Sequence, residues 1–148
     1  MDPEAARALV DANSYLTLAT ADAEGAPWAS PVWFAHEQHE TFLWMSQPGA
    51  RHSRNIAARR EIAIVIFNST VSPRQRNAVY VEAAAAIVPD AELEDAVAVY
   101  AARSVARGLE TLVLEEVSGD APWRLYRARA SAMYVLEDEH DRRVAVML

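Results

Sequence analysis

The sequence predicts one mainly β domain of the α+β kind, an antiparallel six-stranded barrel with flanking helices. Three observations lead to this fold class. Short segments rich in β-branched and aromatic residues recur along the chain, and turn residues separate them. Stretches with helical spacing lie between these segments. The 148 residues contain no repeat and no low-complexity linker, so residues 1–148 are expected to form a single domain.

The first half of the chain reads as a helix followed by a meander of strands. Asp2, Pro3 and Glu4 supply an N-cap, a first-turn proline and a first-turn acid, so a helix is expected to begin there and end near Asn13. A turn over residues 22–25 separates the first two strands. The three strands of the predicted meander are 15–21, 26–36 and 41–46.

The second half alternates helices and strands. Asp90 is expected to cap a helix that continues to about Arg107, because Leu93, Val97 and Tyr100 fit helical spacing. The segment 109–118 fits a short helix. The remaining predicted elements are a helix at 51–60, an apolar strand at 61–67, a strand at 78–88 that Pro89 ends, one strand or a strand pair at 123–137, and an edge strand at 142–148.

Composition excludes several classes of function. The net charge of −7 argues against a nucleic-acid binder, and no apolar run is long enough to cross a membrane. The absence of cysteine excludes disulfides, thiolate catalysis and zinc–thiolate sites, and the absence of lysine excludes Schiff-base chemistry. The acidic, amphipathic N-terminus does not resemble a signal peptide, so the expected location is the cytoplasm.

Positive charge gathers where one strand ends and a helix begins, in WMSQPGARHSRNIAARREIAIVIF (residues 44–67). One interpretation is a solvated basic helix face. The other is an anion site for a group such as a phosphate, in which free helix N–H groups are joined by Arg51, His52 and Arg54, with the hydroxyl of Ser46 nearby.

Four motifs occur in a characteristic order over roughly residues 14–88: GAPWASPVWF (25–34), then TFLWMS, then HSRNI, then EIAIVIF. In this order and spacing the chain resembles the pyridoxamine-phosphate-oxidase-like family of split-barrel flavoproteins. The resemblance implies a split β-barrel and a homodimer that binds flavin mononucleotide (FMN) non-covalently in a groove between its subunits.

The resemblance also implies which residues contact the flavin. By motif position these are Ser30, Pro31, Val32, Trp33, Met45, Ser46, Arg51, His52 and Asn77. It places Arg76 beside the last of them, where its guanidinium would reach the phosphate or serve the dimer.

The chain departs from the family pattern in ways that bear on the substrate. His52 stands where the family has a phosphate-binding lysine, and Ser30 where the true oxidase has an arginine. The Arg-x-His pair that holds the substrate phosphate in the true oxidase is not found near the C-terminus. Pyridoxamine phosphate is therefore not the expected substrate.

The leading hypothesis is a flavin-dependent oxidoreductase that transfers hydride to or from a small-molecule substrate. The cofactor carries the chemistry, so no side chain need act as acid or base, and no catalytic residue is assigned. A deazaflavin coenzyme is an alternative to FMN. Its long acidic tail would need extra cations, and the chain can supply them as Arg54, Arg59, Arg60, Arg74 and Arg76. The alternative from another class is a non-catalytic carrier or sensor module that binds flavin or heme.

Two other groups of residues have simpler interpretations. Trp28 and Trp44 are expected to pack in the barrel or at the dimer interface. His36 and His39 flank a hairpin turn among acidic residues and match no established ligand spacing. We expect a solvated turn there and no metal site.

Overall fold

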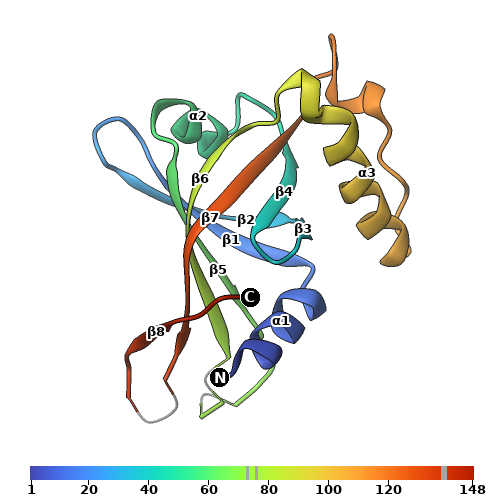
Figure 1. Cartoon of the computed structure of the whole chain (residues 1–148). Coiled ribbons are helices and arrows are strands. Elements are labelled where there is room, and N and C mark those ends of the chain that lie inside the picture. Colours follow the sequence, from blue (N-terminus) through green and yellow to red (C-terminus); the bar gives the residue numbers. More distant parts are fainter. Residues whose placement is uncertain (73, 76, 138–139) are drawn as a thin grey trace.

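The chain forms one curled antiparallel sheet with helices on its outside (Figure 1). The computed structural model describes residues 1–72, 74–75, 77–137 and 140–148. The strands are β1 (Tyr15–Ala21), β2 (Pro27–Trp33), β3 (Ala35–Glu37), β4 (Thr41–Ser46), β5 (Glu61–Phe67), β6 (Ala78–Ile87), β7 (Arg124–Leu136) and β8 (Arg143–Ala145). The helices are α1 (Pro3–Ala12), α2 (Arg51–Ala58) and α3 (Asp90–Ala106), with a 3₁₀ turn η1 (Leu114–Val117).

The strand order explains how the sheet curls into a barrel. The order is β2-β1-β5-β6-β7-β4-β3, with β8 paired to β7. The two end strands, β2 and β3, are consecutive in the chain and are separated only by Phe34. The sheet therefore curves until its ends meet, as the predicted barrel requires.

The barrel interior is filled by the inward-facing half of each strand. In β5 the isoleucines Ile62, Ile64 and Ile66 point inward, while the residues between them face outward. Trp44 is fully buried and stacks on Tyr126, with ring centroids 5.9 Å apart. Trp44 thus packs in the barrel, as expected.

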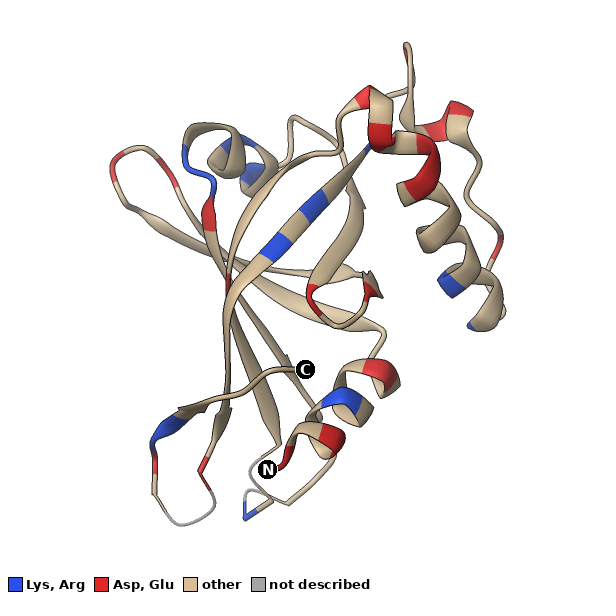
Figure 2. Ribbon diagram, in the orientation of Figure 1, with Lys and Arg blue, Asp and Glu red and all other residues tan. Residues whose placement is uncertain are grey.

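The helices extend this core on two sides. Ala6, Leu9 and Val10 of α1 join the barrel core, and the side chain of Asp2 caps the helix by accepting a hydrogen bond from the Ala5 amide (2.8 Å). α3 packs over a second apolar cluster outside the barrel, formed with residues of β3, β4 and β7. Figure 2 shows basic residues on α2 and acidic residues on the first turns of α3. No helix among the described residues is long and apolar enough to span a membrane.

The prediction of a mainly β, antiparallel barrel with flanking helices is confirmed, but the sheet has eight strands rather than the six expected, and three local details also differ. The predicted strand 26–36 is divided, because the Phe34 amide bonds to the Ser14 carbonyl (3.2 Å) and the chain then leaves β1 to pair with β4. The expected cap at Asp90 is wrong, since Pro89 occupies the N-cap position and Asp90 is the first helical residue. The segment 123–137 is a single long strand, not a pair, because it pairs with both β4 and β6.

Candidate cofactor groove

A groove of about 550 Å³ lies where β2, β4, α2 and α3 approach one another. The turn between β4 and α2 forms one wall, and the segment just before β7 contributes a tryptophan. The lining residues are Pro31, Val32, Trp33, Met45, Ser46, Gln47, Gly49, Ala50, His52, Tyr100 and Trp123. Residues from four separate stretches of the chain, at 31–33, 45–52, 100 and 123, therefore converge on one hollow.

Aromatic side chains form the apolar side of the groove. Trp33 of β2 and Tyr100 of α3 meet edge to face, with centroids 5.0 Å apart and planes inclined at 65°. Burial, followed by the charge of Tyr15, raises the pKa of Tyr100 to about 12, so its hydroxyl stays protonated at neutral pH. Trp123 adds a partly exposed ring. This side suits a flat aromatic ligand.

Hydroxyl and imidazole groups form the polar end. Ser46 Oγ lies 2.7 Å from His52 Nε2, and the Ser53 hydroxyl donates to Ser46 Oγ over 2.9 Å. Burial lowers the pKa of His52, so its ring is neutral near pH 7. His52 therefore contributes a hydrogen-bonding group to this helix start but, unlike the arginines there, no fixed charge.

The start of α2 carries free backbone donors. Ala50 provides no side-chain cap, and the first helical bond runs from the Arg54 amide to the Ala50 carbonyl (3.0 Å). In the part of the chain that the structure describes, the amides of residues 51–53 have no hydrogen-bond partner. These donors and the helix dipole favour an anion at the polar end of the groove.

The two arginines of the helix start have different surroundings. The Arg51 guanidinium stacks over the Trp28 ring at 4.3 Å, outside the groove lining. Stacking uses the face of the guanidinium and leaves its in-plane N–H donors available. Arg54 instead donates to the Gly49 carbonyl, so it closes the turn that precedes α2.

The structure brings together six of the nine predicted cofactor residues, namely Pro31, Val32, Trp33, Met45, Ser46 and His52. Ser30 precedes this set on β2 and Arg51 flanks it, but neither lines the groove. Asn77 lies elsewhere, immediately before β6 and thus at the end of the β5–β6 pair that is remote from α2. Arg76 lies outside the described residues.

Sequence reasoning missed Tyr100 and Trp123 as groove residues. Tyr100 was recognised only as part of the apolar face of a helix, and Trp123 only as the start of a strand. The helical spacing gave a signal that Tyr100 is buried. The spacing could not predict which strands α3 packs against, because this depends on contacts between distant segments of the chain.

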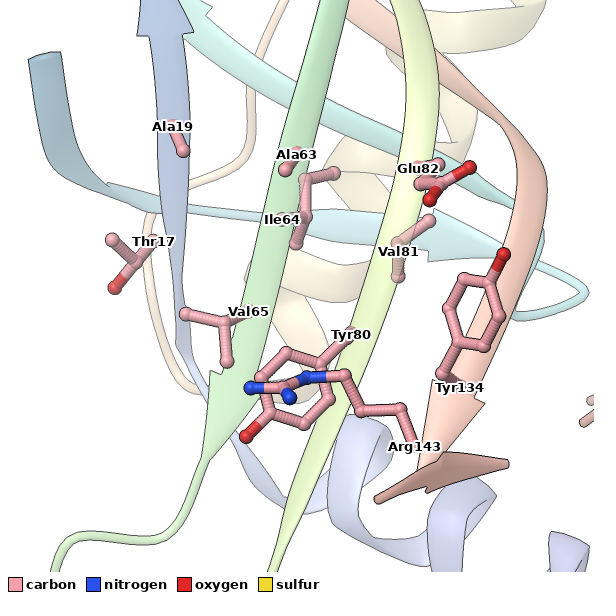
Figure 3. Close-up of a pocket in the computed structure, with 10 residues that line it drawn as sticks. All are labelled: Thr17, Ala19, Ala63, Ile64, Val65, Tyr80, Val81, Glu82, Tyr134 and Arg143. Atoms are coloured by element: carbon pink, nitrogen blue, oxygen red, sulfur yellow. The ribbon is translucent and has the colours of Figure 1, made fainter. Parts of the chain in front are cut away.

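A second hollow, of about 460 Å³, lies on the outer face of the sheet (Figure 3). β1, β5, β6 and β7 line it with small and aromatic residues, and Arg143 stacks over Tyr80 at 4.6 Å. On the same strands Tyr15 is 60% exposed and Phe67 is 49% exposed. The outer sheet face is therefore unusually apolar for a surface.

Comparison with known proteins identifies the family. The model of the pyridoxamine 5'-phosphate oxidase family matches residues 2–146, so the chain belongs to this family. The comparison with curated proteins gives no match.

Several solved structures share the fold. A heme binding protein from Mycobacterium smegmatis superimposes with a TM-score of 0.73 and 22% identity, over 97% of this chain and 56% of that one. HutZ, the heme storage protein from Vibrio cholerae, superimposes with a TM-score of 0.71 and 23% sequence identity. The match covers 91% of this chain and 95% of HutZ. An F420 reductase superimposes with a TM-score of 0.60 and 21% sequence identity, and the match covers 86% of this chain and 94% of the reductase. This chain thus spans little more than half of the mycobacterial protein, and the family fold includes both heme-binding and reductase members.

Proposed function

We propose that the protein is a flavin-dependent oxidoreductase that binds FMN, or a deazaflavin coenzyme, non-covalently at a homodimer interface. Hydride would pass between the cofactor and a small-molecule substrate. The observation that supports this proposal most strongly is the groove, which combines aromatic walls with a polar end at the start of α2. An aromatic ring system that carries an anionic tail matches both parts.

The apolar part of the groove would bind and orient the ring system. Val32 and Trp33 lie at the end of β2, where their backbone groups can meet the polar edge of a ring. Trp33, Tyr100 and Met45 supply apolar surface and limit the access of water. The cofactor supplies the hydride chemistry, and the protein has to hold it in place and shield it.

The polar end would bind the anionic tail. The free amides of residues 51–53 lie at the helix start, and Arg51, which stacks on Trp28 at the edge of the groove, would turn its unused donors toward the same anion. Ser46 adds a hydroxyl, and an anion near His52 would raise the pKa of its ring and draw a proton onto it. Arg51 is thus the one fixed cation of this proposed set.

Homodimer formation would use the apolar outer face of the sheet. The hollow lined by Ala19, Val65, Tyr80 and Tyr134 would be covered by a second copy of the chain. The position of Asn77, remote from the groove of its own chain, is compatible with a cofactor contact only across such an interface.

A heme-binding carrier is the second candidate. Two of the similar structures are described as a heme binding protein and a heme storage protein. His52 is the histidine of the groove lining, and its neutral ring is the form that an axial iron ligand requires. To serve in this way its Nε2 would have to give up the contact with Ser46.

Cofactor titration of the purified protein tests these candidates. FMN, a deazaflavin coenzyme and heme would be titrated separately into wild type and the Arg51→Ala variant, with Arg7→Ala on α1 as the matched control. Loss of a charge-assisted hydrogen bond of about 1.5–3 kcal/mol predicts roughly 10- to 150-fold weaker flavin binding in Arg51→Ala only. Binding of neither flavin would refute the proposal.

Turnover separates the enzyme from the carrier. Reduced nicotinamide would be offered as the electron donor with an artificial acceptor, in the presence of the cofactor that binds. An oxidoreductase consumes the donor at many equivalents per chain. A carrier binds its cofactor and shows no sustained consumption, and it would show a heme spectrum that His52→Ala alters.

A further inference from the structure

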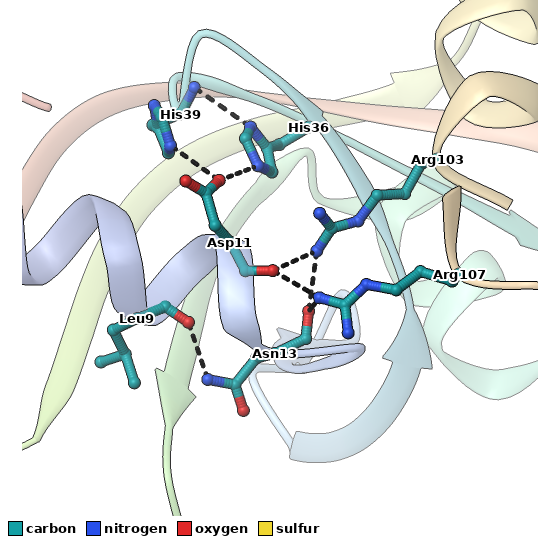
Figure 4. Close-up of polar contacts among 7 residues, drawn as sticks. All are labelled: Leu9, Asp11, Asn13, His36, His39, Arg103 and Arg107. Carbon is teal, nitrogen blue, oxygen red and sulfur yellow. Dashed lines mark hydrogen bonds and ion pairs between the residues drawn. The ribbon is translucent and has the colours of Figure 1, made fainter. Parts of the chain in front are cut away.

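Three potential metal ligands converge away from the groove (Figure 4). Asp11 lies near the end of α1, His36 on β3, and His39 in the turn between β3 and β4. Asp11 Oδ1 lies 2.8 Å from His36 Nε2 and 3.0 Å from His39 Nε2. One ligand atom from each of the three residues lies within 4.8 Å of the others. Two imidazoles therefore point at the same carboxylate oxygen.

The two rings are shielded and the carboxylate is open. The side chains of His36 and His39 are 12% and 17% exposed, against 52% for Asp11. The rings stack with centroids 4.4 Å apart and planes inclined at 29°. The sequence-based expectation of a solvated turn is wrong for these two side chains, because they pack on each other and on Asp11.

The backbone of the turn that carries His39 has an unfavourable conformation for residues other than glycine. Gln38 and His39 both have positive φ, 54° and 60°, and the Glu40 amide bonds to the Glu37 carbonyl (3.2 Å). Two successive residues in this region define the tight hairpin turn that usually carries asparagine and glycine. A histidine is uncommon there, and its ring comes back over His36 as a result.

The backbone of Asp11 is held independently of its side chain. Arg103 donates to the carbonyls of Asp11 (2.9 Å) and Asn13 (3.0 Å), and Arg107 donates to the same two carbonyls. α3 thus fixes the end of α1, as Figure 4 shows. The Asp11 carboxylate remains directed at the two imidazoles.

We propose that Asp11, His36 and His39 bind a divalent transition-metal ion such as Zn²⁺, with at least one position left for water. Two imidazoles and one carboxylate are a ligand set that such ions prefer. With metal–ligand bonds of about 2.0–2.2 Å, neighbouring ligand atoms of a tetrahedral site lie about 3.3–3.6 Å apart. The observed O–N separations of 2.8 and 3.0 Å would need to open only slightly to admit the ion.

Two of the three proposed ligands, His36 and Asp11, have a suitable protonation state at neutral pH. Burial, and then the charge of His39, lowers the pKa of His36, so this ring is neutral. Burial alone would raise the pKa of Asp11, but its contacts with His39 and His36 outweigh that effect and lower it, so the carboxylate is ionised. The His39 amide now donates to His36 Nδ1 over 3.4 Å. A metal at Nε2 requires the other tautomer, so this long hydrogen bond would be given up.

A metal here would join α1 to the β3–β4 hairpin. Asp11 is 25 residues from His36 and 28 from His39 in the sequence. Binding would therefore stabilise the folded chain, in which alone the three ligands meet. This inference does not depend on the groove or on the cofactor that fills it.

Titration with ZnCl₂ and CoCl₂ tests the site on the whole protein, without added cofactor. Wild type is expected to bind one ion per chain, to unfold at a higher temperature with Zn²⁺, and to give the visible absorption of Co²⁺ in a site of low coordination number. His39→Asn is the most direct variant, because asparagine tolerates the left-handed backbone of the turn. Glu40→Gln, on the same turn, is the matched control, since the carboxylate of Glu40 is outside the cluster.

The outcomes separate the proposal from a purely hydrogen-bonded cluster. Both His39→Asn and Asp11→Asn are expected to weaken metal binding by more than about 10-fold, the smallest loss typical of residues that merely support ligands. Glu40→Gln should leave it unchanged. Equal binding by wild type and both ligand variants, or no thermal shift of wild type with Zn²⁺, would overturn the proposal. Unfolding of each variant without metal checks that it folds.

Discussion

Replacing Asn55 by alanine should destabilise the fold, because its side chain ties α2 to the barrel. Asn55 is 5% exposed, and its amide group donates to the hydroxyl of Thr20 on β1 over 3.0 Å. The Thr20 hydroxyl, itself buried, donates in turn to the Trp28 carbonyl (3.4 Å). The chain of hydrogen bonds thus links α2, β1 and β2, and it positions the helix start at the groove.

The magnitude follows from the burial of this pair. Removing one partner leaves the Thr20 hydroxyl without its donor, which costs about 1–3 kcal/mol when the group is buried. We expect a loss of about 2 kcal/mol in the free energy of unfolding. For a chain of this length that corresponds to a melting temperature lower by about 4–8 °C.

Urea unfolding of wild type, Asn55→Ala, Thr20→Val and the double variant measures this loss. All four should be compared at one protein concentration, because a dimer makes stability depend on it. The two single changes should not add, since either one breaks the same hydrogen bond, and a coupling energy of at least about 0.5 kcal/mol is expected. A loss below about 0.5 kcal/mol in Asn55→Ala, or simple additivity, would refute the reasoning.

Three further changes probe the core, the outer face and the half-buried His52. Phe34→Ala should cost about 3–5 kcal/mol in urea unfolding, because Phe34 is fully buried, and a loss below about 1 kcal/mol would contradict that. Val65→Glu should convert a dimer to a monomer in sedimentation, and a monomeric wild type would disprove the proposed interface. Burial lowers the pKa of His52 below 6.5, so the unfolded chain binds its proton more readily. Stability should therefore be full above about pH 6.5 and fall as the pH drops below it, less so in His52→Gln. An unchanged pH dependence in that variant would count against the burial of the ring.

Much of the barrel could be predicted from local pattern. The isoleucines of residues 61–67 and the turn residues at 22–25 mark strands and a hairpin whatever the rest of the chain does. The division at Phe34 could not be predicted, because residues 26–36 are equally suited to a strand throughout. The break arises where the chain exchanges one partner strand, β1, for another, β4.

The candidate groove was predicted in part for the same reason. Motif order predicted that Trp33, Ser46 and His52 belong to one site, and the structure brings all three to the lining of one groove because they lie on neighbouring elements. Asn55 lies within the HSRNI motif but was not singled out there, and the structure shows it to be a buried anchor of α2. The surroundings of the Arg51 guanidinium could not be predicted, because its stacking on Trp28 depends on how α2 packs on β2.

The sequence by itself determined most of the strands and helices, and it indicated candidate anion-binding side chains at the start of α2. Each of those depends on side-chain type and on spacing over a few residues. Only the tertiary structure decided that Tyr100 closes the groove and that Asp11 meets His36 and His39. These contacts join segments tens of residues apart, and they form because α1 buries its apolar face in the barrel core while α3 buries its own against β3, β4 and β7.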